Sequence, residues 1–218
     1  MTPSDYAKAR RALARRDPVI GGLMKVHGAC GLAAAQHVDP FRALTHAIIA
    51  QQLSTKAAAT IEGRFAALFR GRPTPAAVAG VSDAELRAVG LSGQKIGYIR
   101  DLCRRVSAGS LSLEALDVLP DAAVVDALTA VKGIGRWTAE MFLIFRLHRP
   151  DVLPVGDLGI VKAVQRAYGL RTLPSPDRLT RLGERWRPYR SVACWYLWAS
   201  LDNSVKQAGP ATDPALRK

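Results

Sequence analysis

The residue with the clearest chemical potential is an aspartate that follows a proline-glycine turn. Asp157 comes directly after P-V-G and before the apolar run L-G-I-V-K-A-V, which has helical spacing. At this position a carboxylate caps the helix N-terminus, whose N–H groups favour its ionised form. A fixed carboxylate can stabilise developing positive charge and can orient or deprotonate a water molecule. Capping alone would also account for an aspartate here, and the two roles are compatible.

A glycine-rich turn, V-K-G-I-G-R-W-T-A-E, lies a short distance before this aspartate. Apolar spacing predicts one helix over residues 121–130, capped by Asp121, and a second helix over residues 136–147. Between them, Gly133 and Gly135 allow positive φ and keep side chains away from whatever approaches the backbone. The pattern predicts a helix-hairpin-helix whose second helix offers N–H groups to a phosphate. Read from the glycines alone, the pattern favours an ordinary interhelical turn.

The overall charge favours a polyanionic partner. The 218 residues hold 31 Lys and Arg against 18 Asp and Glu, a formal net charge of +13. Nucleic acid is the first candidate for such an excess, although a scattered, solvated basic surface is the alternative. No apolar run approaches the length of a membrane span, and the first residues lack the pattern of a signal peptide. We therefore expect a soluble, cytoplasmic protein without a membrane partner, associated with the nucleoid if the source is bacterial.

The cysteines and histidines show no metal-ligand spacing and no disulfide framework. These residues are Cys30, Cys103, Cys194, His27, His37, His46 and His148. We expect free thiols and no metal site formed by these side chains.

Helix-start signals recur along the chain, and no convincing strand alternation appears, so we expect an all-α fold of eleven to thirteen helices. The predicted start residues are Asp17, Asp39, Ser54, Thr74, Ser82 and Ser92. The first helix, residues 4–16, is rich in arginine and presents either a solvated face or a DNA-facing patch. A loose tail is expected after Val205.

Three separated motifs, in this order, carry a family resemblance. They are L-T-A-V-K-G-I-G-R-W-T-A-E-M-F, D-V-L-P-V-G-D-L-G-I-V-K-A and W-R-P-Y-R-S-x-A. Together, over residues 38–202, they resemble the helix-hairpin-helix/Gly-Pro-Asp superfamily of DNA glycosylases, and within it the alkylated-base branch, DNA-3-methyladenine glycosylase II. The resemblance implies two helical lobes with the ligand cleft between them: residues 38–148, ending in the hairpin, and residues 1–37 with 149–218. We expect no room for the extra N-terminal β domain of larger members.

The resemblance also implies a reaction. Asp157 matches the catalytic aspartate of the family. Where strand-cutting members carry a Schiff-base lysine, this chain has Trp137, and Lys132 and Lys162 do not stand at the matching position. We therefore expect water as the nucleophile and a monofunctional glycosylase that hydrolyses the N-glycosidic bond and leaves an abasic site. The alternatives are a non-catalytic DNA-binding module and a glycosylase with lyase activity.

The implied base pocket combines Trp137, Met141, Trp198 and Gly159. An alkylated purine is cationic and would gain cation–π attraction from the tryptophans, although core packing is the ordinary role of a helical tryptophan. Met141 and Gly159 replace larger family residues, which predicts a roomier pocket. The expected substrates are 3-methyladenine and 7-methylguanine in double-stranded DNA, extending to 1-methyladenine and 3-methylcytosine.

The remaining implied contacts hold the DNA. The expected DNA-binding residues are Lys132, Gly133, Gly135, Arg136, Thr138, Gln51, Gln52, Gly93 and Lys95. A monovalent cation is expected on the carbonyls of Thr129, Val131 and Ile134. Four clustered cysteines hold the iron–sulfur cluster of some relatives, and Cys194 stands alone in the C-terminal segment, so we expect no cluster and no other cofactor. We expect the protein to act as a monomer.

One position departs from the family in a way that affects base flipping. The loop G-L-S-x-x-K resembles the segment from which relatives insert a wedge side chain into the duplex, and the wedge position here is Gly93. A plug would then have to come from Leu91, from Gln94 or from elsewhere. Without one, the enzyme would favour bases that already pair poorly.

Overall fold

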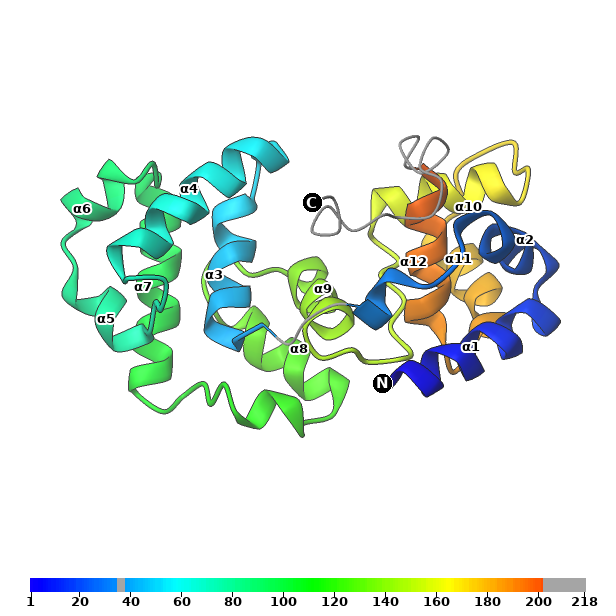
Figure 1. Cartoon of the computed structure of the whole chain (residues 1–218), viewed down its shortest axis with the longest axis horizontal. Helices are drawn as coiled ribbons and strands as arrows, with labels where there is room; N and C mark the ends of the chain where they lie inside the picture. The colour runs from blue at the N-terminus through cyan, green and yellow to red at the C-terminus, as the bar shows by residue number, and fades with distance from the viewer. Residues whose placement is uncertain (35–37, 202–218) are drawn as a thin grey trace, which may run out of the picture. The chain divides into compact units, whose positions relative to one another are not determined.

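The computed structural model describes residues 1–34 and 38–201, which form twelve α-helices and three short 3-10 helices (Figure 1). No strand occurs within these ranges. The all-α fold and the number of helices agree with the sequence-based expectation. His37 and the tail after Val205 lie outside the described residues.

The chain divides into two compact units. The central unit is Gln36–Leu147, and the terminal unit combines Met1–Ala35 with His148–Lys218. The sequence-based boundaries at residues 38 and 148 fall within two residues of this division. The central unit is therefore continuous in sequence, whereas the terminal unit is formed by two separate segments of the chain.

The central unit is built around α7, which packs against α3, α5 and α6, while α3 also contacts α4 and α9. Its elements are α3 (Pro40–Ala50), α4 (Thr55–Leu68), α5 (Pro75–Gly80), α6 (Asp83–Ala88), α7 (Gly93–Ser107), η2 (Ala115–Asp117), α8 (Asp121–Thr129) and α9 (Arg136–Phe145). The predicted start residues Asp39, Ser54, Thr74, Ser82 and Ser92 each accept a backbone N–H in the first turn of their helix. These short-range caps fix where the helices begin.

One expected cap is wrong. Asp121 is the first residue of α8 and Pro120 is the N-cap, without a side-chain capping bond. Proline has no N–H to donate and a fixed φ, so it suits the entry to a helix, and the aspartate one position later still lies in the first turn.

The terminal unit is built around α12, which packs against α1, α2 and α10. Its elements are α1 (Pro3–Arg16), α2 (Pro18–His27), η1 (Gly31–Ala34), α10 (Leu158–Ala167), α11 (Pro176–Gly183), η3 (Glu184–Trp186) and α12 (Arg190–Leu201). Figure 1 shows α12 in orange with α10, in yellow, and the blue N-terminal helices around it. None of the described helices is both long and apolar enough to cross a membrane.

Asp17 forms hydrogen bonds with both sequence segments of the terminal unit. Its Oδ1 accepts the backbone N–H groups of Val19 and Ile20, which confirms its predicted cap of α2. Its Oδ2 accepts the hydroxyl of Tyr168 at 2.6 Å and the indole N–H of Trp186 at 3.0 Å. The carboxylate is 1% exposed, so these four bonds compensate for its burial.

Candidate functional site

The hairpin turn of the central unit depends on one glycine more than on the other. Gly133 has φ +80°, and a Cβ built there would lie 2.1 Å from the ring of Tyr98. Gly135 has φ −92°, so the expectation of positive φ holds only for Gly133. A Cβ at Gly135 would meet nothing within 4 Å, which leaves the backbone there open to approach. The fold thus requires a glycine at position 133, whereas packing within the described chain does not require one at position 135.

The first turn of α9 is suited to bind an anion. Gly135 is its N-cap, and within the described chain no side chain caps this turn. Lys132 and Arg136 are exposed beside it, with Arg136 held at 3.0 Å by Glu140. Backbone N–H groups at a helix start with cations nearby form a site for a phosphate. Thr138 is 8% exposed, so little of its side chain is accessible for the expected DNA contact, which stays a prediction.

Gln51 and Lys95 support the hairpin from α3 and α7. The Gln51 side-chain amide donates to the carbonyl of Gly133 at 2.8 Å. The ammonium of Lys95 donates to the carbonyls of Ile49 and Gln51, at 2.7 and 2.8 Å, and burial lowers its pKa. Lys95 therefore caps the C-terminus of α3 with its ammonium group, and its expected DNA contact stays a prediction.

Asp101 is a hairpin support that the sequence pattern did not reveal. The residue is 4% exposed, and its Oδ2 accepts the backbone N–H of Lys132 at 2.9 Å. The same carboxylate accepts hydrogen bonds from Arg104 and Arg105. Burial alone would raise the pKa of Asp101, but the Lys132 N–H and both guanidinium groups offset it and hold the pKa at about 2.

The loop around Gly93 supplies fewer candidates for a duplex plug than expected. Gly93 is exposed at the start of α7, and a Cβ there would meet nothing within 4 Å. Leu91 is 4% exposed and belongs to the core, so it is not a plug. Gln94 is exposed, but its amide donates to the hydroxyl of Tyr98 at 2.6 Å.

The segment between α3 and α4 presents a better candidate. Gln52 is exposed and has φ +56°, a conformation that L side chains seldom adopt. The next residue, Leu53, is 38% exposed. Residues in such sparsely populated backbone conformations cluster at active sites and ligand clamps. Because Gln51 is bonded to the hairpin, this pair of exposed side chains is anchored to the same support.

In the terminal unit, Asp157 is the N-cap of α10, as predicted. Its Oδ1 accepts the backbone N–H of Ile160 at 2.7 Å and the indole N–H of Trp198 at 3.0 Å. The residue is 7% exposed. Two donors from two helices therefore fix one oxygen of the carboxylate.

Gly159 makes this arrangement possible. A Cβ on Gly159 would lie 2.9 Å from Oδ1 of Asp157 and 3.2 Å from Cδ1 of Trp198. The space above the glycine is thus filled by the indole, so the expectation that Gly159 widens the pocket is not supported. The glycine instead lets Trp198 reach the carboxylate.

The third sequence motif holds the segment that leads to Asp157. The Asp151 carboxylate accepts hydrogen bonds from the guanidinium groups of Arg187 at 2.8 Å and Arg190 at 2.6 Å. Ser191 accepts the backbone N–H of Val152 at 3.0 Å. The arginines and the serine of W-R-P-Y-R-S therefore position the loop that ends at the carboxylate, a structural role that sequence reasoning had not assigned to them.

The aromatic candidates differ in exposure. Trp137 is 51% exposed on α9, and Met141, one turn later on the same face, is half-buried. Trp198 is half-buried in the terminal unit. So much exposed area on Trp137 favours a binding role over core packing, because a core tryptophan is largely buried.

The described residues contain no cluster of three or more His, Cys, Asp or Glu side chains suited to a metal ion. For the expected monovalent cation, the carbonyl of Val131 already accepts the N–H of Ile134 at 3.1 Å. A carbonyl oxygen has two lone pairs, so this bond leaves it able to bind a cation as well.

A family model described as HhH-GPD superfamily base excision DNA repair protein matches residues 45–188. Among curated relatives, DNA-3-methyladenine glycosylase 1 of Schizosaccharomyces pombe is 34% identical over 163 residues, which cover 73% of this chain and 72% of the relative.

Solved structures show the same similarity. The S. pombe 3-methyladenine DNA glycosylase Mag1 in complex with abasic DNA is 32% identical with a TM-score of 0.79, over 88% of this chain and 96% of that one. A DNA-3-methyladenine glycosidase from Bacillus halodurans is 37% identical with a TM-score of 0.81, over 91% of both chains.

Proposed function

Because the chain belongs to the HhH-GPD superfamily of base excision DNA repair proteins, we propose that it is a DNA glycosylase that removes alkylated bases by hydrolysis. The observation that carries the proposal is the carboxylate of Asp157, fixed by Ile160 and Trp198. The relatives named as 3-methyladenine glycosylases support the choice of substrate class.

The proposed chemistry places Asp157 against the deoxyribose. Breaking an N-glycosidic bond develops positive charge on the sugar, and a preorganised carboxylate stabilises that charge. The same group orients the attacking water or accepts its proton. The two donors on Oδ1 hold the carboxylate in place before the substrate arrives, so little reorganisation is needed during the reaction.

Water is the proposed nucleophile because the family's lysine position is occupied by Trp137. Lys132 is the nearest lysine in sequence, but it does not stand at the matching position. A reaction without a Schiff base releases the base and leaves the strand intact at an abasic site.

Recognition of the base rests on Trp137, Met141 and Trp198. An alkylated purine carries positive charge, which strengthens stacking on an indole and makes the base a better leaving group. The proposed substrates are 3-methyladenine and 7-methylguanine, with 1-methyladenine and 3-methylcytosine as further candidates.

The hairpin supplies affinity for the strand. Backbone N–H groups at the start of α9, with Lys132 and Arg136 nearby, bind phosphates without reading sequence. A monovalent cation on the carbonyls of Thr129, Val131 and Ile134 would add positive charge at this turn. We propose further that Gln52 and Leu53 fill the space left by the extruded base, since both are exposed beside the anchored Gln51.

The test is a panel of duplexes carrying single lesions, with base release and strand cleavage measured separately. Release of 3-methyladenine without cleavage, and no adduct trapped by borohydride, is the expected result. A trapped adduct would indicate a lyase, and DNA binding without release would indicate a non-catalytic module. Light scattering with and without duplex tests the proposed monomer.

A further inference from the structure

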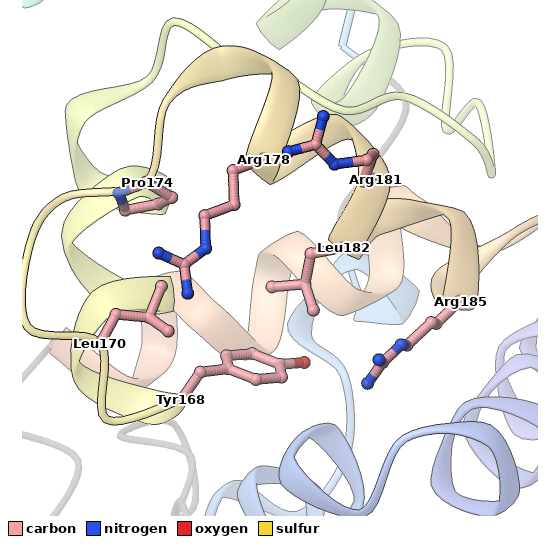
Figure 2. A pocket seen from close by; sticks show the side chains of 7 residues that line it. All are labelled: Tyr168, Leu170, Pro174, Arg178, Arg181, Leu182 and Arg185. Carbon is pink, nitrogen blue, oxygen red and sulfur yellow. The ribbon is translucent and has the colours of Figure 1, made fainter.

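A cavity of about 310 Å³ lies in the terminal unit, beside α11 and η3 (Figure 2). Three arginines line it: Arg178 and Arg181 on α11, and Arg185 on η3. Spacings of three and four residues place them along one side of this segment. In Figure 2 the guanidinium groups of Arg178 and Arg185 flank Leu182.

The arginines of this cavity carry charge that no neighbour neutralises. All three are exposed, and among the described residues none of them forms an ion pair with a carboxylate. The carboxylate between them in sequence, Glu184, accepts from Arg187 at 2.8 Å instead. Three unpaired cations around one cavity repel each other, so a bound anion would relieve that repulsion.

The other walls are apolar. Leu170, Pro174 and Leu182 line the cavity with the ring of Tyr168. The Tyr168 hydroxyl is committed to Asp17, and burial together with that carboxylate raises its pKa, so the phenol stays protonated. Tyr168 therefore offers a fixed ring surface, and the positive charge comes from the arginines alone.

The volume and the walls argue for more than an inorganic anion. Small-molecule sites span about 300–1,000 Å³, and a phosphate ion alone would leave most of this cavity empty. A group with an apolar or planar body would cover the leucines, the proline and the tyrosine ring. A guanidinium fork binds two oxygens of one phosphate group, which favours a phosphate over a lone carboxylate at the arginines that line the cavity.

The cavity is distinct from the carboxylate site. Asp157 precedes α10 and Tyr168 follows it, so the ten residues of this helix separate the two by about 15 Å. A ligand in the cavity lies at the opposite end of α10 from the reacting sugar.

We propose that this cavity binds a nucleotide, with its phosphates against the guanidinium groups that line the cavity and its base against Tyr168 and the leucines. The nucleotide is either free or the 5′-phosphorylated end of a nucleic acid strand, since both present the same chemistry. This site is additional to the excision site and does not depend on it.

The test is calorimetric titration of the full chain with dADP, dAMP, pyrophosphate, and a short single strand with a 5′-phosphate or a 5′-hydroxyl. We expect one saturable site that binds dADP more tightly than pyrophosphate. Arg178→Gln and Arg185→Gln should each weaken dADP binding roughly tenfold. Arg178→Lys should weaken it less, because lysine keeps the charge but lacks the two parallel N–H donors of a guanidinium group. Tighter binding of dADP identifies the free nucleotide as the ligand, and tighter binding of the 5′-phosphorylated strand identifies the strand end.

Arg11→Gln is the matched control. Arg11 is an exposed arginine on α1 that does not line the cavity, so this variant loses the same charge without removing a cavity residue and should bind dADP as the wild type does. Gly135→Asp tests whether the hairpin is the real site, and it should leave dADP binding intact. Base excision by the Arg178 and Arg185 variants should remain normal. Equal weakening by Arg11→Gln, loss with Gly135→Asp, or absence of saturable binding would each overturn the proposal.

Discussion

The indole N–H of Trp198 donates a 3.0 Å hydrogen bond to Oδ1 of Asp157, across the bare Cα of Gly159. Residues 157 and 159 come from the start of α10, and residue 198 comes from α12. The position of the carboxylate thus depends on the packing of two helices as well as on a helix cap. Substitutions at Gly159 and Trp198 should therefore affect the carboxylate, as well as substitutions at Asp157 itself.

Asp157→Asn should keep the fold and DNA binding but slow base excision by roughly two orders of magnitude or more, because a placed electrostatic group contributes several kcal/mol. Asparagine is as good an N-cap as aspartate, so stability should change little. Single-turnover release of 3-methyladenine, with affinity for abasic duplex as the control, measures the effect. Excision near the wild-type rate would remove Asp157 from the mechanism.

Trp198→Phe should lower kcat by roughly tenfold while KM changes much less, since it keeps an aromatic ring but removes the N–H that orients Asp157. Gly159→Ala should act in the same direction, because its Cβ would lie 2.9 Å from Oδ1. Gly22→Ala is the matched control: Gly22 is an exposed helical glycine of α2 where a Cβ meets nothing within 4 Å. A rise in KM alone for Trp198→Phe would assign the indole to the base pocket only.

Gly135→Asp should weaken binding to damaged and undamaged duplex alike, by roughly tenfold, because it places negative charge where phosphates approach. Gly135→Ala should fold normally, since its Cβ has open space. Anisotropy titrations with matched duplexes measure both variants. A loss confined to damaged DNA would contradict a phosphate-binding hairpin.

Asp101 should make the stability of the central unit depend on pH in the acid range. The pKa of Asp101 is about 2 in the folded state against an ordinary 3.8, so its stabilisation is present above about pH 4 and is lost as the pH falls towards 2. The shift corresponds to about 2 kcal/mol of unfolding free energy. Urea unfolding should therefore show a higher free energy of unfolding for the wild type than for Asp101→Asn at pH 7. This difference should become smaller towards pH 3.

Asp126→Asn, on α8, serves as the control for that series. Its side chain makes no hydrogen bond or ion pair within the described part of the chain. If the difference in unfolding free energy between Asp126→Asn and the wild type depends on pH in the same way, the effect comes from general charge and not from Asp101.

Gln52→Gly should remove the proposed plug without harming the fold, because glycine accepts the positive φ of this position more readily than glutamine. Excision should fall most for well-paired lesions such as 7-methylguanine opposite cytosine, where base flipping costs most. Leu53→Ala should act in the same direction.

Gly93→Leu tests the opposite hypothesis, that the duplex is left without a wedge. A side chain at Gly93 has open space, so this variant should fold, and it should speed excision of well-paired lesions if the wild type lacks a plug. If Gln52→Gly has no effect and Gly93→Leu accelerates excision, the enzyme depends on lesions that already weaken the helix.

The features that could be predicted from sequence depend on short-range chemistry. Ser54, Ser82 and Ser92 cap helices through bonds to backbone N–H groups three residues away, so the local pattern suffices. The cap by Asp157 is of the same kind.

The features that could not be predicted join residues far apart in the chain. Asp101 meets the Lys132 N–H across 31 positions, and Lys95 meets the end of α3 across more than 40. An aspartate or lysine on an amphipathic helix has the same local pattern whether it faces solvent or a buried carbonyl. The role of Gly159 likewise depends on Trp198, which packing alone brings to it.

The two sequence segments of the terminal unit give the protein an order of assembly. During synthesis the central unit, Gln36–Leu147, is complete and able to fold before the terminal unit has all its parts. Asp157 leaves the ribosome soon afterwards, but Arg190, Ser191 and Trp198, which hold its loop and its carboxylate, belong to the last described helix. A nascent chain therefore completes the turn proposed to bind phosphates before it positions the Asp157 carboxylate, so on the proposed roles an incomplete chain could hold DNA before it could excise a base.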